Sequence, residues 1–147
     1  MFRHLPRLMA PLLVLVLSGC DGLDLLLRDS VGKVEGEVRL PGLSAPATIR
    51  RDAYGVPLIE ADSEDDLAFA VGYVMASDRL AQMVSYSLVA QGRISEMAGR
   101  PTRDLDVYMR TMGLRRNAER HLAVASPDLL HKLQRFADGV NAWVAEH

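Results

Sequence analysis

Apolar and polar residues alternate from residue 34 to residue 40, the period-two pattern of a half-exposed strand. Proline and glycine at positions 41–42 end this pattern. The chain is therefore predicted to begin its folded part with a short strand.

Two further short strands are predicted at residues 47–51 and 56–61, on either side of a turn at 52–55. Gly55 can take the positive φ angle that such a turn often needs. Pro57 has no N–H group for a sheet ladder, so we expect it at the start of its strand or at a sheet edge. These features predict a hairpin.

After Ser63 the period of the apolar residues lengthens to that of a helix. Ser63 can cap the helix N-terminus, with Asp66 three residues later as a weaker form of the capping box. Gly72 costs such a helix roughly 1 kcal/mol relative to alanine, so we expect close packing there. Gly92 is the predicted stop. The predicted buried stripe consists of Leu67, Ala70, Val71, Val74 and Met75.

Asp78 conflicts with this stripe. It follows Leu67 by eleven residues, which at about 100° per residue returns it to nearly the same side of the helix. A carboxylate aimed at a core is costly unless it is paired. Either the helix breaks near residues 76–77, or Asp78 is buried with a cationic or hydrogen-bonding partner. We favour these two readings over a catalytic acid.

Three more helical segments are predicted. A helical turn at 94–98 is closed by Gly99, and a longer helix begins near residue 105 and runs to 124. Residues 126–128 read Ser-Pro-Asp, a strong helix start, because serine caps and proline suits the first position. The chain stops at residue 147 with no capping signal, as expected for a truncated gene or an excised fragment. The last helix should pack through Leu129, Leu133, Phe136, Val140 and Trp143.

The N-terminal residues 1–19 have the pattern of a lipoprotein signal peptide, with arginines followed by a short apolar run. Leu-Ser-Gly before Cys20 resembles the bacterial lipobox, in which the thiol is lipidated; an ordinary signal peptide with an incidental cysteine is the alternative. Residues 20–32 would then be a lipidated tether, and 33–147 an incomplete domain. Acyl chains on Cys20 would hold the protein on a membrane facing the periplasm. Asp21 favours the inner membrane.

The charge and cysteine content of the chain restrict its possible partners and cross-links. Removal of Arg3 and Arg7 from 17 basic residues leaves 15 against 19 acidic ones, a net charge of about −4. This mild acidity gives no electrostatic case for nucleic acid. The single cysteine excludes an intrachain disulfide. With 49% apolar residues, the chain can form a core of at most one domain.

Few residues offer chemistry. His121 and His131 lie in polar helical surroundings typical of surface residues, and His147 is the last residue. No metal or phosphate motif occurs, so we assign no catalytic and no metal-binding residue. The basic run 115–121 is expected to be a solvated helix face, with lipid headgroups as the alternative.

Four blocks carry a family resemblance. They read R-D-A-Y-G-V-P at 51–57, G-Y-V-M-A-S-D-R-L-A-Q-M at 72–83, G-R-I-S-E at 92–96 and A-D-G-V-N-A-W at 137–143. In this order they resemble the start of the α chain in the penicillin acylase family, whose members are N-terminal-nucleophile hydrolases. The resemblance spans about residues 47–144. It implies an α+β fold, a part of the four-layer αββα body, mostly helical after a set of short N-terminal strands.

The resemblance also implies a mechanism in which the active site lies elsewhere. Such precursors cut themselves into an α chain and a β chain, and the new N-terminal serine of the β chain attacks the amide carbonyl. Calcium is possible in the full-length enzyme, while no cofactor is expected in this chain. Its family-motif residues are expected to be structural. They are Asp52, Tyr54, Gly55, Pro57, Gly72, Asp78, Arg79, Gly92, Glu96, Asp138, Gly139 and Asn141.

The implied partners are a β chain of the same precursor and a small N-acyl amide substrate. The resemblance points to cleavage of the acyl amide bond of β-lactam antibiotics or related N-acyl compounds. Acyl-homoserine lactones are an alternative substrate. A non-catalytic lipoprotein module is the alternative from another class. By itself the chain is expected to be inactive.

Overall fold

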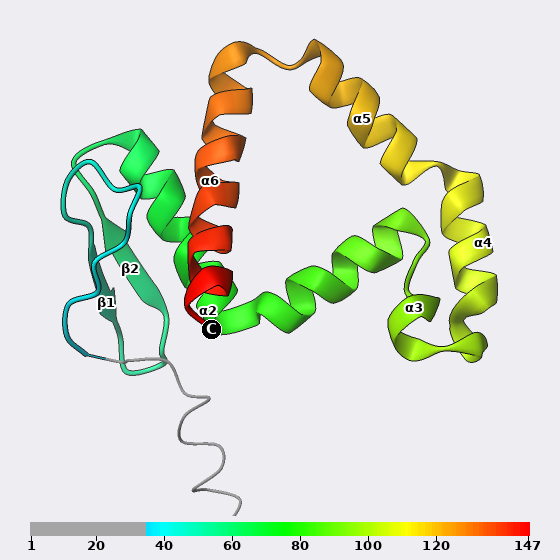
Figure 1. The fold of residues 1–147 in the computed structure, drawn as a ribbon, viewed down its shortest axis with the longest axis horizontal. Helices are drawn as coiled ribbons and strands as arrows, with labels where there is room; N and C mark the ends of the chain where they lie inside the picture. Colours follow the sequence, from blue (N-terminus) through cyan, green and yellow to red (C-terminus); the bar gives the residue numbers. More distant parts are fainter. Residues whose placement is uncertain (1–34) are drawn as a thin grey trace, which may run out of the picture. The chain divides into compact units, whose positions relative to one another are not determined.

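The computed structural model describes residues 35–147 (Figure 1). The predicted signal peptide, Cys20 and the tether lie outside these residues, as does Val34 at the start of the first predicted strand. Residues from Arg39 to His147 form one compact unit. Among the described residues, no helix has the length and the apolar character needed to cross a bilayer.

The predicted hairpin is confirmed. Strand β1 (Thr48–Arg51) pairs antiparallel with β2 (Pro57–Glu60), in a register that sets Thr48 opposite Glu60 and Arg51 opposite Pro57. The strand predicted at 34–40 is wrong for its described part, where the backbone has no regular secondary structure. A strand needs a neighbour for its N–H and C=O groups, and within residues 35–147 this segment has none.

Helix α2 (Glu64–Gln91) begins and ends as predicted. The Ser63 hydroxyl accepts a hydrogen bond of 3.1 Å from the Asp66 N–H, and Gly92 closes the helix with a left-handed φ of 65°. A kink divides α2 at Arg79, whose φ of −143° is not helical. In Figure 1 the two halves of α2 point in clearly different directions.

The buried side of α2 differs from the predicted stripe. Ala70 and Val74 are buried as predicted, but Leu67 and Met75 are exposed, while Phe69 is buried. The core-facing side is set by the helix that packs against α2, and a single-sequence pattern cannot indicate which neighbouring helix that is. The core of this unit is small and consists of Phe69, Ala70, Val74, Ala76 and Ile94.

The segment predicted as one helix from 105 to 124 is two helices. After α3 (Ser95–Ala98) and the 3-10 turn η1 (Arg100–Thr102), α4 (Arg103–Met112) ends at Gly113 and α5 (Leu114–Val124) begins there. Gly113 has a φ of 73°, which reverses the helical path at that point. Its N–H bonds to Met109 O and its C=O accepts from Asn117 N–H, so one glycine ends α4 and starts α5.

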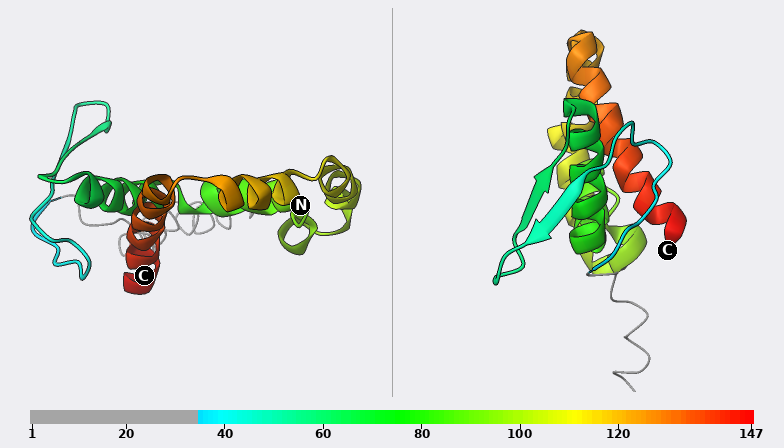
Figure 2. Two further views of the ribbon diagram at one scale, coloured as in Figure 1. Left: turned by 90° about the horizontal axis from the view of Figure 1, so that it is seen from above. Right: turned by 90° about the vertical axis from the view of Figure 1, so that its left-hand side faces the viewer.

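Helix α6 (Pro127–Glu146) starts as predicted, with the Ser126 hydroxyl accepting from the Leu129 N–H at 3.2 Å. It packs against the N-terminal half of α2 and runs in the same direction, as Figures 1 and 2 show. After the excursion through α3, α4 and α5, the start of α6 therefore lies beside the start of α2, and the end of α6 lies near Tyr73.

Candidate functional site

The first matched block forms the tight turn of the hairpin. A carboxylate oxygen of Asp52 accepts from the N–H groups of Tyr54 and Val56, both at 2.9 Å. Gly55 has a φ of 78°, and its N–H bonds to Asp52 O at 3.0 Å. Pro57 begins β2, a position that needs no N–H donor. Tyr54 is 93% exposed at the tip, so its side chain has no packing role within the described residues.

Arg51 links this hairpin to the kink of α2. Its two Nη atoms donate to the two carboxylate oxygens of Asp78 at 2.9 and 2.7 Å, and Nη1 also donates to Gly55 O at 3.0 Å. The hydrogen bond from Arg51, aided by its charge, lowers the pKa of Asp78 from its ordinary value.

The structure combines parts of both readings of Asp78: the helix is interrupted, at Arg79, and the carboxylate is paired with Arg51. The expected burial of Asp78 is wrong, because its side chain turns out of the helix to meet Arg51 and stays exposed. The interruption falls slightly later than predicted. It turns the Asp78 side chain, about one third exposed, toward the hairpin rather than the core.

Two glycines let α2 and α6 cross at backbone contact. A Cβ atom at Gly72 would lie 2.1 Å from Phe136 O, and one at Gly139 would lie 1.9 Å from Phe69 O. The contact is reciprocal, since each glycine faces a carbonyl of the other helix. The predicted close packing at Gly72 is confirmed.

Side chains around this crossing hold α6 in place. Tyr73 donates to Glu146 at 2.8 Å and packs edge-on against Trp143, with ring centroids 5.4 Å apart. Burial, together with that hydrogen bond and the charge of Glu146, raises the pKa of Tyr73 to about 12. Asp138 accepts from Gln134 and Arg135 on its own helix, and Asn141 lies exposed.

Asp66 forms a buried polar contact that the sequence analysis missed. Its side chain is 1% exposed and accepts from the Ser44 hydroxyl at 2.6 Å, the Ser44 N–H at 2.9 Å and the Ala45 N–H at 3.2 Å. The bonds from Ser44 lower the pKa of Asp66 to about 2. The carboxylate therefore holds the loop before β1 instead of completing a capping box, and no spacing in the sequence links Ser44 to Asp66.

Asp106 plays the same part for the block at 92–96. It is 5% exposed and accepts from the N–H groups of Ile94 and Ser95 at 2.8 and 3.0 Å, and from the Ser95 hydroxyl. Burial acts to raise its pKa, but these hydrogen bonds outweigh burial and leave the pKa lowered. Gly92 lies against α4, because a Cβ there would be 2.6 Å from Asp106 O.

Glu96 is also an internal contact of this block. Its two carboxylate oxygens accept from the Arg93 guanidinium at 2.7 and 2.8 Å. Arg110 of α4 donates to Gly92 O at 2.8 Å. The block thus fixes the corner between α2, α3 and α4.

The three histidines among residues 35–147 do not form a catalytic set. His131 pairs with Asp65 at 2.8 Å in an exposed position, and His147 stacks on Trp143. His121 is exposed on α5. In the part of the chain that the structure describes, no three His, Cys, Asp or Glu side chains are grouped to hold a metal ion. The calcium implied by the resemblance thus has no ligand set among these residues.

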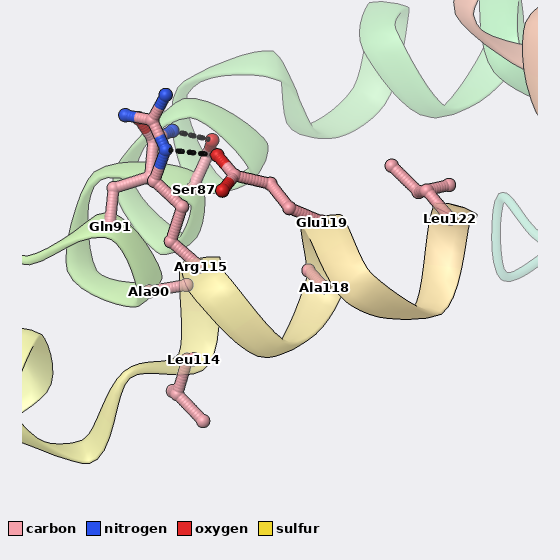
Figure 3. A pocket seen from close by; sticks show the side chains of 8 residues that line it. All are labelled: Ser87, Ala90, Gln91, Leu114, Arg115, Ala118, Glu119 and Leu122. Atoms are coloured by element: carbon pink, nitrogen blue, oxygen red, sulfur yellow. Dashed lines mark hydrogen bonds and ion pairs between the residues drawn. The ribbon is translucent and has the colours of Figure 1, made fainter. Parts of the chain in front are cut away.

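A hollow of about 480 Å³ lies between the C-terminal half of α2 and α5 (Figure 3). Figure 3 shows an Arg115–Glu119 ion pair on its α5 side and a hydrogen bond between Ser87 and Gln91 on its α2 side. A second, smaller hollow of about 300 Å³ lies beside it, around Gln91 and Arg116. The one carboxylate among the lining residues, Glu119, is paired with Arg115, and neither hollow contains a nucleophile with a base beside it.

The chain is similar to known proteins. Residues 46–147 match the family model described as penicillin amidase. The chain is 44% identical over 146 residues to "Acyl-homoserine lactone acylase QuiP" of Pseudomonas aeruginosa, covering 97% of this chain and 17% of that protein. It is 34% identical over 119 residues to "Penicillin acylase 2 proenzyme" of Pseudomonas sp., covering 81% of this chain and 15% of that protein. The chain thus spans about a sixth of the length of these relatives.

A solved structure shows the same fold. Penicillin G acylase from Alcaligenes faecalis superposes with a TM-score of 0.60 at 30% identity, covering 69% of this chain and 54% of that chain. The α+β fold expected for a part of an N-terminal-nucleophile hydrolase is therefore confirmed. The matched region includes the turn, the kink, the glycine crossing and the corner described above. The chain belongs to the penicillin amidase family.

Proposed function

We propose that this chain is the N-terminal part of the α chain of a self-processing amidohydrolase that cleaves the acyl amide bond of β-lactam antibiotics or related N-acyl compounds. The observation that carries the proposal is the family match over residues 46–147, together with relatives named as acylases. Family membership rests on the matched residues, whereas the activity belongs to a protein several times longer.

The role of this chain would be structural support for the active site of the complete protein. Asp66, Asp106 and the Arg51–Asp78 pair each join segments distant in sequence. Catalytic groups need rigid support, because small displacements of the reacting atoms lower the rate of the reaction. The matched blocks would therefore contribute by holding one wall of the body in place.

The reaction itself would use the β chain. Its N-terminal serine hydroxyl would attack the amide carbonyl, with its own α-amine as base. An α-amine has an ordinary pKa of about 8, so a substantial fraction is neutral at pH 7. Because amine and hydroxyl belong to one residue, the base is held beside the nucleophile. Hydrogen-bond donors of the β chain would stabilise the oxyanion.

Acyl-homoserine lactones are a second candidate substrate. The observation in favour is the 44% identity to a relative named as an acyl-homoserine lactone acylase, which covers nearly the whole chain. The bond cleaved is again an amide between an acyl group and an amine, so the same nucleophile would serve. A non-catalytic lipoprotein module is the candidate of another class.

We also propose that the protein is exported to the bacterial cell envelope and held on a membrane by lipid on Cys20. The support is the sequence before and at Cys20, which combines an apolar run with Leu-Ser-Gly-Cys. Asp21 supports the inner membrane as the final location.

The test uses the complete reading frame that contains this chain. Expressed with its export signal, the product should appear as two chains, the second beginning with serine by mass spectrometry. It should hydrolyse phenylacetyl or fatty-acyl anilides, penicillins or acyl-homoserine lactones. Replacement of that serine by alanine should abolish both cleavage and hydrolysis.

The candidates separate by outcome. Faster hydrolysis of acyl-homoserine lactones than of penicillins selects the second substrate. A complete protein that is neither cleaved nor active on any of these amides refutes the enzyme proposal and leaves the non-catalytic module. Residues 1–147 alone should show no turnover, and measurable turnover by that pure chain would also contradict the proposal.

A further inference from the structure

Helix α5 is an amphipathic helix whose apolar side is incompletely covered. All eleven of its residues are exposed, although Leu114, Ala118 and Leu122 recur at four-residue intervals on one side. Leu114 is 41% exposed and Leu122 is 49% exposed. A helix of this pattern normally buries such a stripe. Within the described residues, α5 leaves it half in solvent.

The stripe lines the hollow between α5 and α2, which is open to solvent. Leu114, Ala118 and Leu122 line the hollow from α5, and Ala90 lines it from α2 (Figure 3). The volume of about 480 Å³ exceeds that of any single side chain, so the two helices do not close on each other. This surface, which we call the α2–α5 groove, is an apolar gap between two helices.

The charges at the rim are already satisfied. Arg115 donates to Glu119 at 2.9 Å, and Gln91 donates to Ser87 at 2.8 Å. Because these polar groups pair with each other, the groove has no free charge to attract a charged ligand. Its chemistry favours an apolar occupant.

The length and shape of the groove fit a helix. From Leu114 to Leu122 the stripe extends about 12 Å, or a little over two helical turns at 1.5 Å per residue. A strand laid in a groove between two helices would leave its N–H and C=O groups unpaired, whereas a helix satisfies its own. Side chains at i and i+4 of a third helix can fill such a gap.

The likeness to longer proteins indicates where this helix would come from. The chain spans 17% of the relative that it matches over 97% of its own length. About five sixths of such a protein thus lies outside the part that matches residues 1–147 and is available to cover apolar surface left open here. We propose that the α2–α5 groove is an intramolecular docking site for an amphipathic helix from the downstream part of the same precursor.

This inference rests on the proposed function, because it requires a downstream part. It goes beyond that function by assigning the α2–α5 groove as the contact surface and an amphipathic helix as its partner. The helix would dock through apolar side chains, so the contact should be insensitive to salt.

The test compares two alanines of α5 in the complete protein. Ala118 lines the groove, whereas Ala123 is exposed and is not part of its lining. Variants Ala118→Cys and Ala123→Cys are made separately, and alkylation of each new thiol is followed by mass spectrometry of its own peptide. Each rate is divided by the rate of the same variant in denaturant. We expect the thiol at position 118 to react at least tenfold more slowly than the thiol at 123.

Each result decides the inference. Equal normalised rates at the two positions, in a protein that cleaves itself and hydrolyses amides, overturn the docking site and leave the proposed function intact. Slow reaction at 118 only after addition of anionic phospholipid vesicles also overturns it, because the groove would then face a membrane. Absence of a downstream chain refutes both. If either cysteine variant fails to fold, Ala118→Glu and Ala123→Glu replace them, and only the first should reduce the yield of cleaved protein.

Discussion

Replacement of Gly139 by alanine should separate helices α2 and α6. The added Cβ would lie 1.9 Å from Phe69 O, more than 1 Å closer than such atoms normally approach. The obstacle is a backbone carbonyl, which cannot rotate away as a side chain can. Overpacking of this kind costs about 1–3 kcal/mol, and we expect the upper end of this range. Alanine has a higher helix propensity than glycine by about 1 kcal/mol, which offsets part of this cost, so the net loss of stability should be about 2 kcal/mol.

Hydrogen exchange of backbone amides in the complete protein measures this loss locally. A destabilisation of about 2 kcal/mol corresponds to roughly 30-fold faster exchange, here in the peptides that contain Phe69 and Gly139. Gly72→Ala should act similarly, because its Cβ would lie 2.1 Å from Phe136 O. Asn141→Ala is the matched control, since Asn141 is exposed on the same helix. If Gly139→Ala and Gly72→Ala exchange as slowly as the unchanged protein, the backbone contact is not present and the reasoning is refuted.

Three other predictions concern the polar contacts and the anchor. Arg51→Lys should lose the two-point contact with Asp78 and destabilise the hairpin by about 1 kcal/mol. A double-mutant cycle with Asp78→Asn would measure this interaction, and full additivity of the two changes in stability would contradict the pairing. The Asp66 carboxylate has a pKa lowered to about 2, so its stabilisation of the loop at Ser44 should be complete above pH 4 and lost as the pH falls through 2. Exchange of the Ser44 and Ala45 amides should therefore become more protected between pH 2 and 4 relative to Asp66→Asn, and equal pH profiles for the two proteins would exclude this role. Cys20→Ser should release the protein from membranes, and unchanged fractionation would disprove the lipobox.

The local features of the fold were predictable because their causes lie within a few residues. Ser63 and Ser126 cap helices through N–H groups three residues away. Asp52 and Gly55 form their turn from adjacent backbone groups. Gly72 could be assigned to a close contact because glycine within a helix needs a reason.

The remaining features depend on partners far along the chain. The sequence predicts that the Asp66 side chain bonds within its own helix turn, but in the structure it accepts a hydrogen bond from Ser44. The two residues are brought together only by the fold, and no periodic pattern in the sequence indicates this contact. The Arg51 partner of Asp78 lies 27 residues away, so only its type could be anticipated. The sequence does not mark Gly113 as a helix end, because the residues on both sides continue a helical pattern and its positive φ is a property of the folded backbone.

The crossing at Gly72 and Gly139 also sets the order in which the chain can fold during synthesis. Helix α2 is complete once residue 91 has emerged, but its partner α6 begins only at Pro127. At about 5–20 residues per second, the roughly 65 residues between Gly72 and Gly139 take on the order of 3–13 seconds to appear. Throughout that interval Phe69 and Val74 have no α6 to pack against. The N-terminal half of α2 is therefore the segment of the emerging chain that a chaperone would need to shield.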